Sequence, residues 1–356
     1  MYPKCNYDNT MTYFDSDYMV GAHPEVLARL VETNMLHTPG YGHDAMCAEA
    51  RQTILDVCGI ADGEVFFLEG GTQTNAIVLD RLLDHNDGVI AAETSHINVH
   101  EAGAVEATGH KVIALSGCDG KLSADSIENY LKDFYADSTH VFMVRPGAVY
   151  ISYPTELGTL YSREELHEIH EICRRYSIPL YIDGARLAYA LGAAPDLTLR
   201  DIASMCEVFY IGGTKCGALL GEAVVSTRRL LLPRFESLIK LHGATMAKGR
   251  ILGVQFQTLM AGGLYERIGR HGVEMAKRVR KLMTGAGYPV YIDSPTNQQF
   301  FVLPNNTIDS LFESGISFEL WGARGMESTP VRFVTDWATT SGDIDSLALA
   351  LAHCKK

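Results

Sequence analysis

The chain has 356 residues, 47% hydrophobic and 21% charged, a composition typical of a globular α/β protein with one or two domains. Its formal net charge of −13, from 30 basic and 43 acidic residues, argues against nucleic acid or an anionic membrane as the main partner. The eight cysteines form no CxxC pair, and the N-terminus lacks a signal-peptide pattern. No window approaches the roughly 18 apolar residues of a membrane span. We therefore expect a cytoplasmic protein with reduced thiols.

Short β-branched and aromatic runs alternate with helical patterns over the first two thirds of the chain. This alternation predicts a mostly parallel sheet with helices on both faces. A capping box at Ser162–Glu165 marks the start of a helix predicted over Arg163–Tyr176. The predicted strands are Val65–Leu68, Val89–Ala92, Lys111–Leu115, His140–Val144, Leu180–Asp183, Val208–Ile211 and Ala223–Ser226.

The alternation stops after about Met246. A long helical stretch then runs towards Gly285, and a last helix is predicted over Gly342–His353. Three further strands are predicted at Phe300–Leu303, Ser317–Trp321 and Val331–Val334. We therefore expect a large domain over 21–245, a smaller α+β domain over 246–356, and an N-terminal segment, 1–20, that packs with the smaller domain.

Polar motifs follow four of the predicted strands, at the sheet edge where ligands of such folds bind. The turn after Leu68 contains Gly70, Gly71 and Thr72 and opens a helix, so its free backbone N–H groups can face an anion. A glycine-rich turn that only caps the helix, without binding a ligand, explains the same sequence motif. This motif alone therefore does not establish a ligand site.

Two further motifs supply a carboxylate and an amine. Asp183 ends an apolar strand, with Arg186 three residues later, although an aspartate at this place can also cap the next helix. Lys215 follows another strand and lies among small and apolar residues. Desolvation lowers the pKa of such a lysine and leaves a nucleophilic amine.

The fourth motif, Ser95–Glu101, contains His96 and His100 four residues apart. This spacing resembles a zinc pair, but no third ligand follows at a useful distance, and we expect no metal. Pyridoxal phosphate, in contrast, needs a lysine, an anion at its ring nitrogen and a phosphate cradle. Lys215, Asp183 and the Gly70–Thr72 turn meet these needs, and His96 can stack on the ring.

The runs EGGTQTN, SHINVHEAGA, YIDGARLAYAL and GGTKCGALLG, in this order, resemble the threonine aldolase and β-eliminating lyase family from about Phe14 to Trp337. The resemblance implies fold type I of the pyridoxal-phosphate enzymes, an aspartate aminotransferase-like architecture. It also implies a lyase that splits a β-hydroxy-α-amino acid, such as threonine or allo-threonine, into glycine and an aldehyde. A homodimer or homotetramer with sites shared between subunits is implied as well.

The resemblance also implies individual roles. Lys215 is the Schiff-base lysine, Asp183 pairs with the ring nitrogen and His96 stacks on the ring. Arg186 borders the cofactor and also belongs to the clamp on the substrate carboxylate, where two arginine forks suit one carboxylate. The remaining implied residues are Gly71 and Thr72 at the phosphate, Ser16 and Arg332 at the substrate carboxylate, and Lys248 and Arg250 at a neighbouring subunit's cofactor, although a solvated helix face explains the last two equally well.

Two positions depart from the family pattern. Asp15 precedes Ser16 where an arginine is usual. Glu156 stands in a loop where aldolases of the family commonly carry a histidine that touches the substrate hydroxyl. Glu156 or His96, acting through water, is therefore the candidate base. A β-eliminating lyase or an aminotransferase remains the alternative. A catalytically idle cofactor-binding sensor is a more distant alternative. A dinucleotide-binding enzyme is disfavoured because no GxGxxG motif follows an early strand.

Overall fold

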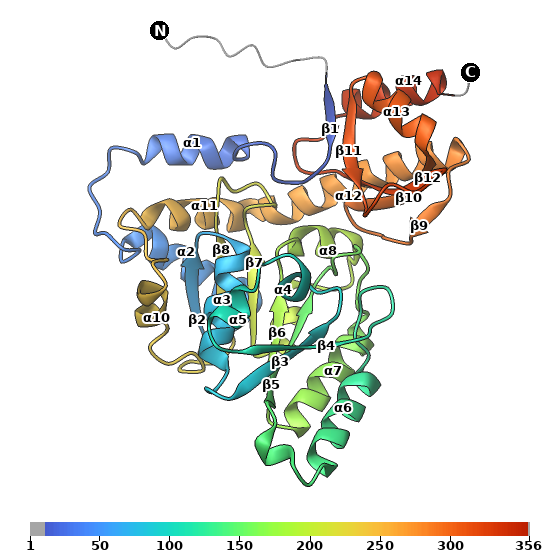
Figure 1. The fold of residues 1–356 in the computed structure, drawn as a ribbon. Coiled ribbons are helices and arrows are strands. Elements are labelled where there is room, and N and C mark those ends of the chain that lie inside the picture. The colour runs from blue at the N-terminus through green and yellow to red at the C-terminus, as the bar shows by residue number, and fades with distance from the viewer. Residues whose placement is uncertain (1–10, 355–356) are drawn as a thin grey trace.

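A seven-stranded sheet forms the centre of the computed structural model, which describes residues 11–354 (Figure 1). The strand order is β2-β8-β7-β6-β5-β3-β4, and all neighbours are parallel except the pairs that β8 makes with β2 and β7. The predicted, mostly parallel sheet is confirmed. The strands are β2 (Glu64–Leu68), β3 (Asp87–Ala92), β4 (Lys111–Leu115), β5 (Arg145–Ser152), β6 (Leu180–Asp183), β7 (Val208–Gly212) and β8 (Glu222–Ser226).

One predicted strand is wrong. The segment His140–Val144 begins with the 3-10 helix η1 (His140–Phe142), and the strand β5 follows it. The pair Pro146-Gly147, which is typical of a turn, lies inside β5. The register between β3 and β5 shifts by one residue at Gly147, and a bulge of this kind tolerates a proline that donates no ladder hydrogen bond.

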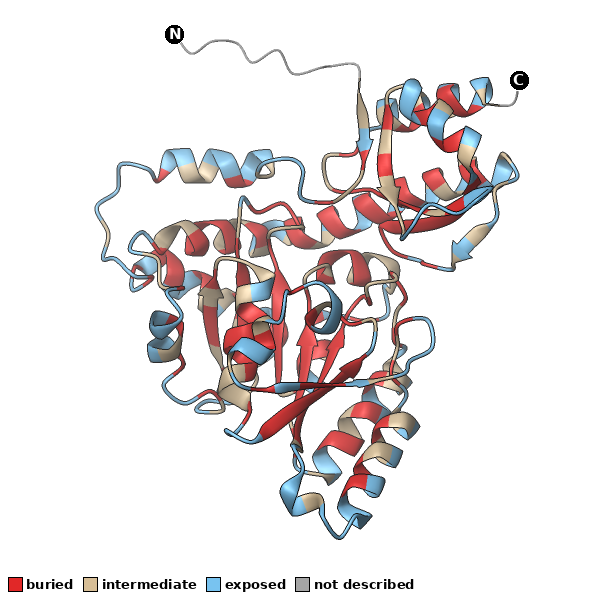
Figure 2. Ribbon diagram, viewed as in Figure 1, coloured by how far each residue is buried: buried red, intermediate tan, exposed pale blue. Residues whose placement is uncertain are grey.

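Helices cover both faces of this sheet, because its strands alternate between two apolar cores. In β6, Ile182 faces a core formed with α2, α6, α7, α8, α9 and α11, whereas Tyr181 faces a core formed with α3, α4, α5 and α10. Figure 2 shows the strands as a buried layer between the partly exposed helices. The predicted capping box at Ser162 and Glu165 is confirmed at the start of α7. These helices are α2 (Ala45–Cys58), α3 (Gly71–Leu82), α4 (His96–Val99), α5 (Ala104–Ala107), α6 (Ala124–Ala136), α7 (Arg163–Arg175), α8 (Leu187–Ala193), α9 (Leu199–Ser204), α10 (Phe235–Leu241) and α11 (Arg250–Met260).

A second sheet, in the order β1-β11-β12-β10-β9, forms the smaller part of the molecule. Its edge strand β1 (Thr12–Phe14) comes from the N-terminal end and pairs in parallel with β11 (Ile316–Leu320). The first ten residues of the predicted segment 1–20, including Cys5, lie outside the described residues. The other elements are β9 (Val290–Ile292), β10 (Gln298–Pro304), β12 (Ser328–Val334), α13 (Asn305–Glu313) and α14 (Ser341–His353).

Two helices, α11 and α12 (Leu264–Gly285), take the place of the single predicted helical stretch, and α12 connects the two cores. The helix α11 ends where Gly262 and Gly263 take positive φ angles of 57° and 69°, and α12 follows. Ile268 of α12 packs in the large core, whereas Val279 packs in the small one. The division at residue 246 therefore stays a prediction, since both helices beyond it contact the large core.

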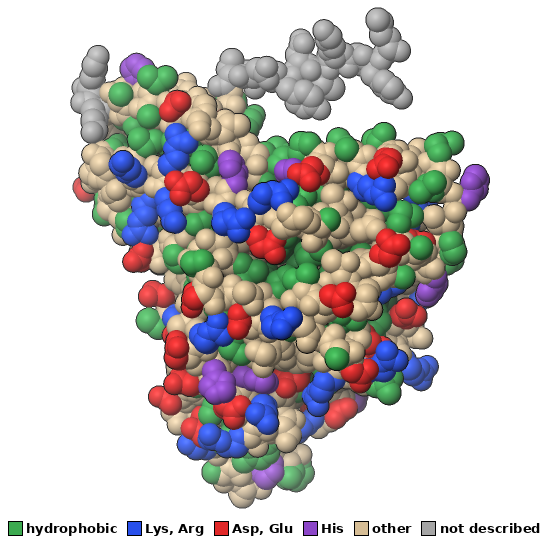
Figure 3. Space-filling model, turned by 180° about the vertical axis from the view of Figure 1, so that it is seen from behind, with side chains coloured by type: hydrophobic (Ala, Val, Ile, Leu, Met, Phe, Trp, Pro, Cys, Tyr) green, Lys and Arg blue, Asp and Glu red, His purple; other side chains and the backbone are tan. Residues whose placement is uncertain are grey.

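The molecular surface is mixed in charge. On the face shown in Figure 3, Lys and Arg side chains are interspersed with Asp and Glu. None of the helices within residues 11–354 combines the length and apolar character that crossing a bilayer requires. Over the same residues, no group of three or more His, Cys, Asp or Glu side chains is arranged to hold a metal ion, and the seven cysteines are free thiols.

Candidate active site

A cavity of about 320 Å³ opens at the carboxyl-terminal edge of the large sheet. Loops that follow β2, β3, β5, β6 and β7 line it, as expected for a ligand site on a parallel sheet. The chain thus brings seven of the residues predicted from the sequence to one place. They are Gly71, Thr72, His96, Glu156, Asp183, Arg186 and Lys215.

The carboxylate of Asp183 is held rigidly on the cavity floor. Its Oδ2 accepts hydrogen bonds from the Tyr150 hydroxyl at 2.7 Å and from the Asn75 amide at 2.9 Å. Its Oδ1 accepts from the Tyr210 hydroxyl at 2.5 Å and from the Ala185 backbone N–H at 2.9 Å. Burial alone would raise the pKa of Asp183, but the bonds from the two tyrosines, the charge of His96 and the Ala185 N–H together outweigh burial and lower the pKa. Asp183 is therefore a buried, fixed anion.

Lys215 lies in the turn that follows β7, within the same cavity. The Tyr189 hydroxyl donates to its backbone carbonyl at 2.8 Å and anchors the turn. Burial lowers the pKa of the Lys215 amine, and the nearby charge of Arg186 lowers it further. A lysine in this state exposes a nucleophilic amine to the cavity.

The start of α3 offers free backbone donors to the cavity. Gly70 precedes the helix, and no side chain caps the N–H groups of the first turn. Gly71 also lets the chain pass close to the site, because a Cβ there would lie 3.2 Å from the Tyr210 hydroxyl. Thr72 is exposed beside these donors. The arrangement suits an anionic group of a ligand.

His96 and Glu156 form a connected pair above this floor. The Nδ1 of His96 lies 2.8 Å from Oε1 of Glu101, a carboxylate that also accepts from Asn75 at 2.7 Å. Oε1 of Glu156 accepts from the His96 backbone N–H at 2.8 Å and from the Ser152 hydroxyl at 2.6 Å. Burial raises the pKa of Glu156 although the Ser152 bond opposes it. Glu156 is therefore a constrained carboxyl group with increased proton affinity.

Both predicted arginines of the carboxylate clamp are engaged by the protein's own carboxylates. Arg186 pairs with the buried Asp17 through Nε–Oδ2 at 2.7 Å and Nη2–Oδ1 at 3.0 Å. Arg332 donates through Nη2 to Glu319 and through Nη1 to Gln298 at 2.8 Å. The two forks are close enough that the charge of Arg186 adds to burial in lowering the pKa of Arg332. The role of Arg186 and Arg332 at a substrate carboxylate stays a prediction.

Four predicted residues do not line the cavity of this chain: Arg332, whose partners are given above, Ser16, Lys248 and Arg250. Ser16 is half-buried two residues before the lining residue Tyr18. Lys248 is exposed, and Arg250 donates to the backbone carbonyls of residues 33 and 34 at 2.5 and 3.1 Å. A role for Lys248 and Arg250 at a neighbouring subunit stays a prediction.

The sequence did not single out several residues that the fold places in the site. Glu222, 3% exposed, lies at the start of β8 and accepts from the Gly213 backbone N–H at 3.0 Å. Burial raises the pKa of Glu222 to about 8, and the charge of Lys215 opposes this rise. A charged residue that opens an otherwise apolar strand, next to the lysine loop, is the signal that indicates it. Asn75, Glu101, Tyr150, Tyr210 and Asp17 were also not predicted.

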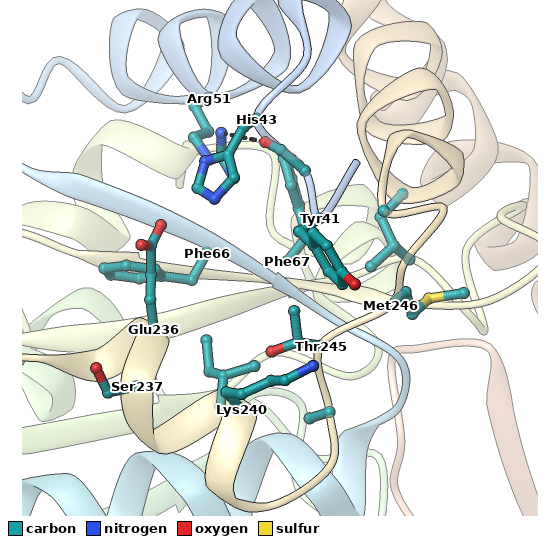
Figure 4. Close-up of a pocket in the computed structure, with 15 residues that line it drawn as sticks. Tyr41, His43, Arg51, Phe66, Phe67, Glu236, Ser237, Lys240, Thr245 and Met246 are labelled. Carbon is teal, nitrogen blue, oxygen red and sulfur yellow. Dashed lines mark hydrogen bonds between the residues drawn. The ribbon is translucent and has the colours of Figure 1, made fainter. Parts of the chain in front are cut away.

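A larger cavity of about 570 Å³ lies elsewhere, between residues 41–43, the strand β2 and α10 (Figure 4). Arg51 donates to the Gly42 carbonyl at 2.9 Å there, and the Lys240 ammonium lies 5.1 Å from the centre of the Tyr41 ring. It contains neither a buried lysine nor a fixed carboxylate. The smaller cavity is the candidate active site because its chemistry, not its size, is distinctive.

Comparisons with family models, with curated relatives and with solved structures agree on one family. Residues 14–306 match the family described as beta-eliminating lyase. A low specificity L-threonine aldolase from Pseudomonas sp. (strain NCIMB 10558) is 29% identical over 94% of this chain and 95% of its own length. The solved threonine aldolase of Leishmania major is 39% identical, with a TM-score of 0.91 over 96% of this chain and 98% of that one. Aspartate aminotransferase from Thermus thermophilus is 12% identical and shares the fold, with a TM-score of 0.66 over 97% of this chain and 92% of that one. The architecture is therefore the expected fold type I.

Proposed function

Because the chain belongs to the beta-eliminating lyase family, we propose that it is a lyase that cleaves a β-hydroxy-α-amino acid of the threonine type into glycine and an aldehyde. The likeness to threonine aldolases over nearly the whole chain supports this reaction. The observation that supports it most strongly is the cavity itself, because Lys215, the fixed anion Asp183 and Glu156 all line it.

We propose pyridoxal phosphate as the cofactor, and the residues present fit it. The bare N-terminus of α3, with Gly71 and Thr72, suits the phosphate. Asp183, kept anionic by four donors, suits the protonated ring nitrogen. The amine of Lys215 suits the aldehyde. When bound, the cofactor supplies an electron sink for the bond that breaks at Cα.

The chain's own residues then position the substrate and move its proton. Glu156 has a raised pKa and a fixed orientation, so it accepts the β-hydroxyl proton when it is ionised. His96, oriented by Glu101, would cover the face of the cofactor ring. We assign Arg186, Arg332 and Ser16 to the α-carboxylate of the substrate, and the charges of the two arginines lie close together. Such a clamp would set the orientation of the bonds at Cα relative to the cofactor ring. That orientation would favour cleavage of the Cα–Cβ bond over loss of the Cα proton.

We further propose an assembly of two or four copies with sites shared between them. Apolar side chains on and around α1 (Pro24–Glu32), which projects beside α11 in Figure 1, support it, since Val31 and Met35 are 68% and 83% exposed. Lys248 and Arg250 lie at the surface where they can reach a neighbouring copy's site. The free thiols support a cytoplasmic location. The other exposed apolar residues of this region are Tyr18, Met19, Val20, Leu27, Leu36 and Tyr41.

A product assay tests the reaction. Purified protein loaded with pyridoxal phosphate is incubated with threonine, allo-threonine, phenylserine and serine. We expect glycine and the matching aldehyde from the first three. Ammonia with a 2-oxo acid in place of glycine would instead assign the β-elimination chemistry that the family name also covers. No product from any of the four would contradict both assignments.

A further inference from the structure

Glu319 and Arg332 are direct cross-strand neighbours in the smaller sheet. Glu319 of β11 lies opposite Arg332 of β12 in the antiparallel register, so both side chains project from the same face. Nη2 of Arg332 donates to Oε2 of Glu319, and the guanidinium carbon lies 5.0 Å from the centre of the Trp321 ring. Glu319 thus occupies one edge of the fork that we assign to the substrate carboxylate.

The two partners are held very differently. Arg332 is buried and fixed by Gln298 and Trp321, yet its Nε has no hydrogen-bond partner. The side chain of Glu319 is 42% exposed, and among the described residues Arg332 is its one hydrogen-bond partner. The carboxylate of Glu319 can therefore swing into water at little cost, whereas the guanidinium cannot leave.

The pair formed by Asp17 and Arg186 provides the contrast. Asp17 is 1% exposed, is held by both Nε and Nη2 of Arg186, and also accepts from the Asn297 amide at 2.9 Å. That carboxylate is a permanent part of the site. Of the two carboxylates on the clamp, only Glu319 is displaceable.

We propose that Glu319 is an internal competitor of the substrate α-carboxylate: it occupies Arg332 in the substrate-free protein and is displaced to solvent when an amino acid binds. The inference rests on the proposed function, because it takes Arg332 as the carboxylate site. It makes Glu319 the residue that sets the amino-acid affinity of the protein. A carboxylate this close also repels the incoming one, so competition and repulsion weaken binding in the same direction.

Glu319→Gln tests the proposal in the cofactor-loaded protein. An exposed ion pair is worth up to about 1 kcal/mol, so we expect the KM for allo-threonine to fall roughly two- to fivefold, with kcat little changed. Glu313→Gln, an exposed glutamate at the end of α13, is the matched control. Should the Gln variant fold poorly, Glu319→Thr suits the strand and removes the same charge. An unchanged or raised KM in a folded variant would overturn the proposal and leave the pair as an ordinary cross-strand contact.

A binding measurement separates this inference from the proposed function. The dissociation constant of glycine, measured by calorimetry, needs no turnover and should fall by the same factor in Glu319→Gln. In the Arg332→Gln background, removal of Glu319 should tighten glycine binding by a smaller factor, because only the repulsion remains. Tightening by the full factor without Arg332 would contradict the direct competition. If glycine binding behaves as expected but no aldehyde forms, the proposed reaction fails while the role of Glu319 stands.

Discussion

The Tyr210 hydroxyl donates to Oδ1 of Asp183 at 2.5 Å, from the strand next to the one that carries the carboxylate. Both residues lie at the same end of the sheet, so the fold itself supplies the donor that keeps Asp183 ionised. Tyr150, on the strand at the other side of β6, donates a second phenol hydrogen bond to the same carboxylate. Because both donors stabilise the ionised form, Asp183 is a permanent anion, and the first prediction concerns the loss of this charge.

Asp183→Asn should fold and bind the cofactor, but turnover should fall roughly 10²–10³-fold, because an amide cannot hold the ring nitrogen protonated. Steady-state glycine release, with circular dichroism as the folding control, measures this. Tyr210→Phe leaves the carboxylate in place and should reduce turnover less. Wild-type rates in Asp183→Asn would remove the proposed role of this residue.

Lys215→Ala should abolish the visible absorbance that the protein acquires with pyridoxal phosphate, together with nearly all turnover. Only an amine in the cavity can attach the cofactor aldehyde. Spectra of the purified, folded variant decide the matter. If the absorbance persists, the attachment site is another lysine.

Arg332→Lys should raise the KM for the amino acid strongly and leave the cofactor spectrum unchanged. Lysine lacks the planar fork that binds a carboxylate through two parallel hydrogen bonds. Kinetics over a range of amino-acid concentrations, beside the spectrum of the same sample, measure both. An unchanged KM would reduce Arg332 to a structural partner of Glu319 and Gln298.

Glu156→Gln should lower glycine release by roughly 10²-fold and remove the acid limb of its pH profile. Glutamine still accepts from Ser152 and the His96 backbone but cannot take a proton. Because burial raises the pKa of Glu156, activity of the wild type should increase with pH as this carboxyl ionises. Glu156→His should also be slower, since the loop is already built around a carboxylate.

Glu168→Gln, on the exposed face of α7, is the control for these rates. If glycine release were equal in the wild type, Glu156→Gln and Glu156→His, Glu156 would take no part. The base would then be His96 or a bound water.

Glu222→Gln should change how the stability of the cofactor-free protein depends on pH. The folded pKa of Glu222, about 8, lies above its unfolded value, so the folded state alone keeps this proton at intermediate pH. The contribution of Glu222 to the free energy of unfolding therefore falls as pH rises towards about 8, and it is constant above that pH. Relative to the wild type, the variant should gain roughly 1–3 kcal/mol between about pH 5 and pH 8.

Denaturant unfolding at both pH values measures this gain. Glu64→Gln, at the other end of the β2–β8 pair, is the control. The lowered pKa of Lys215 acts in the opposite sense at higher pH, so the comparison stops near pH 8. A difference that does not vary with pH would show that Glu222 is ionised throughout.

Much of the cavity was predictable because its residues follow buried strands. Asp183 ends an unbroken apolar run, and Lys215 follows another after two glycines, so local patterns place both at one edge of the sheet. The strand β5 was missed because Pro146 and Gly147 are typical of a turn, and only the bulge against β3 accommodates them.

The partners of the two arginines were not predictable. Asp17 and Arg186 are 169 positions apart, and no local pattern links them. Glu319 and Arg332 meet only through the register of β11 and β12, which the alternation of side chains does not fix by itself. Ion pairs that depend on tertiary register are absent from single-sequence patterns, so the sequence indicated neither Asp17 nor Glu319 as a partner of these arginines.

The pairing of β1 with β11 gives the chain a definite order of assembly during synthesis. Every residue that lines the cavity lies before position 223, but the large core that supports the cavity also contains side chains of α11 and α12. The strand β1, with Asp17 three residues beyond it, must wait for β11 to emerge some 300 residues later. A product truncated before β11 therefore keeps every residue that lines the cavity but lacks Arg332, the second arginine of the proposed clamp, and leaves β1 without its partner strand.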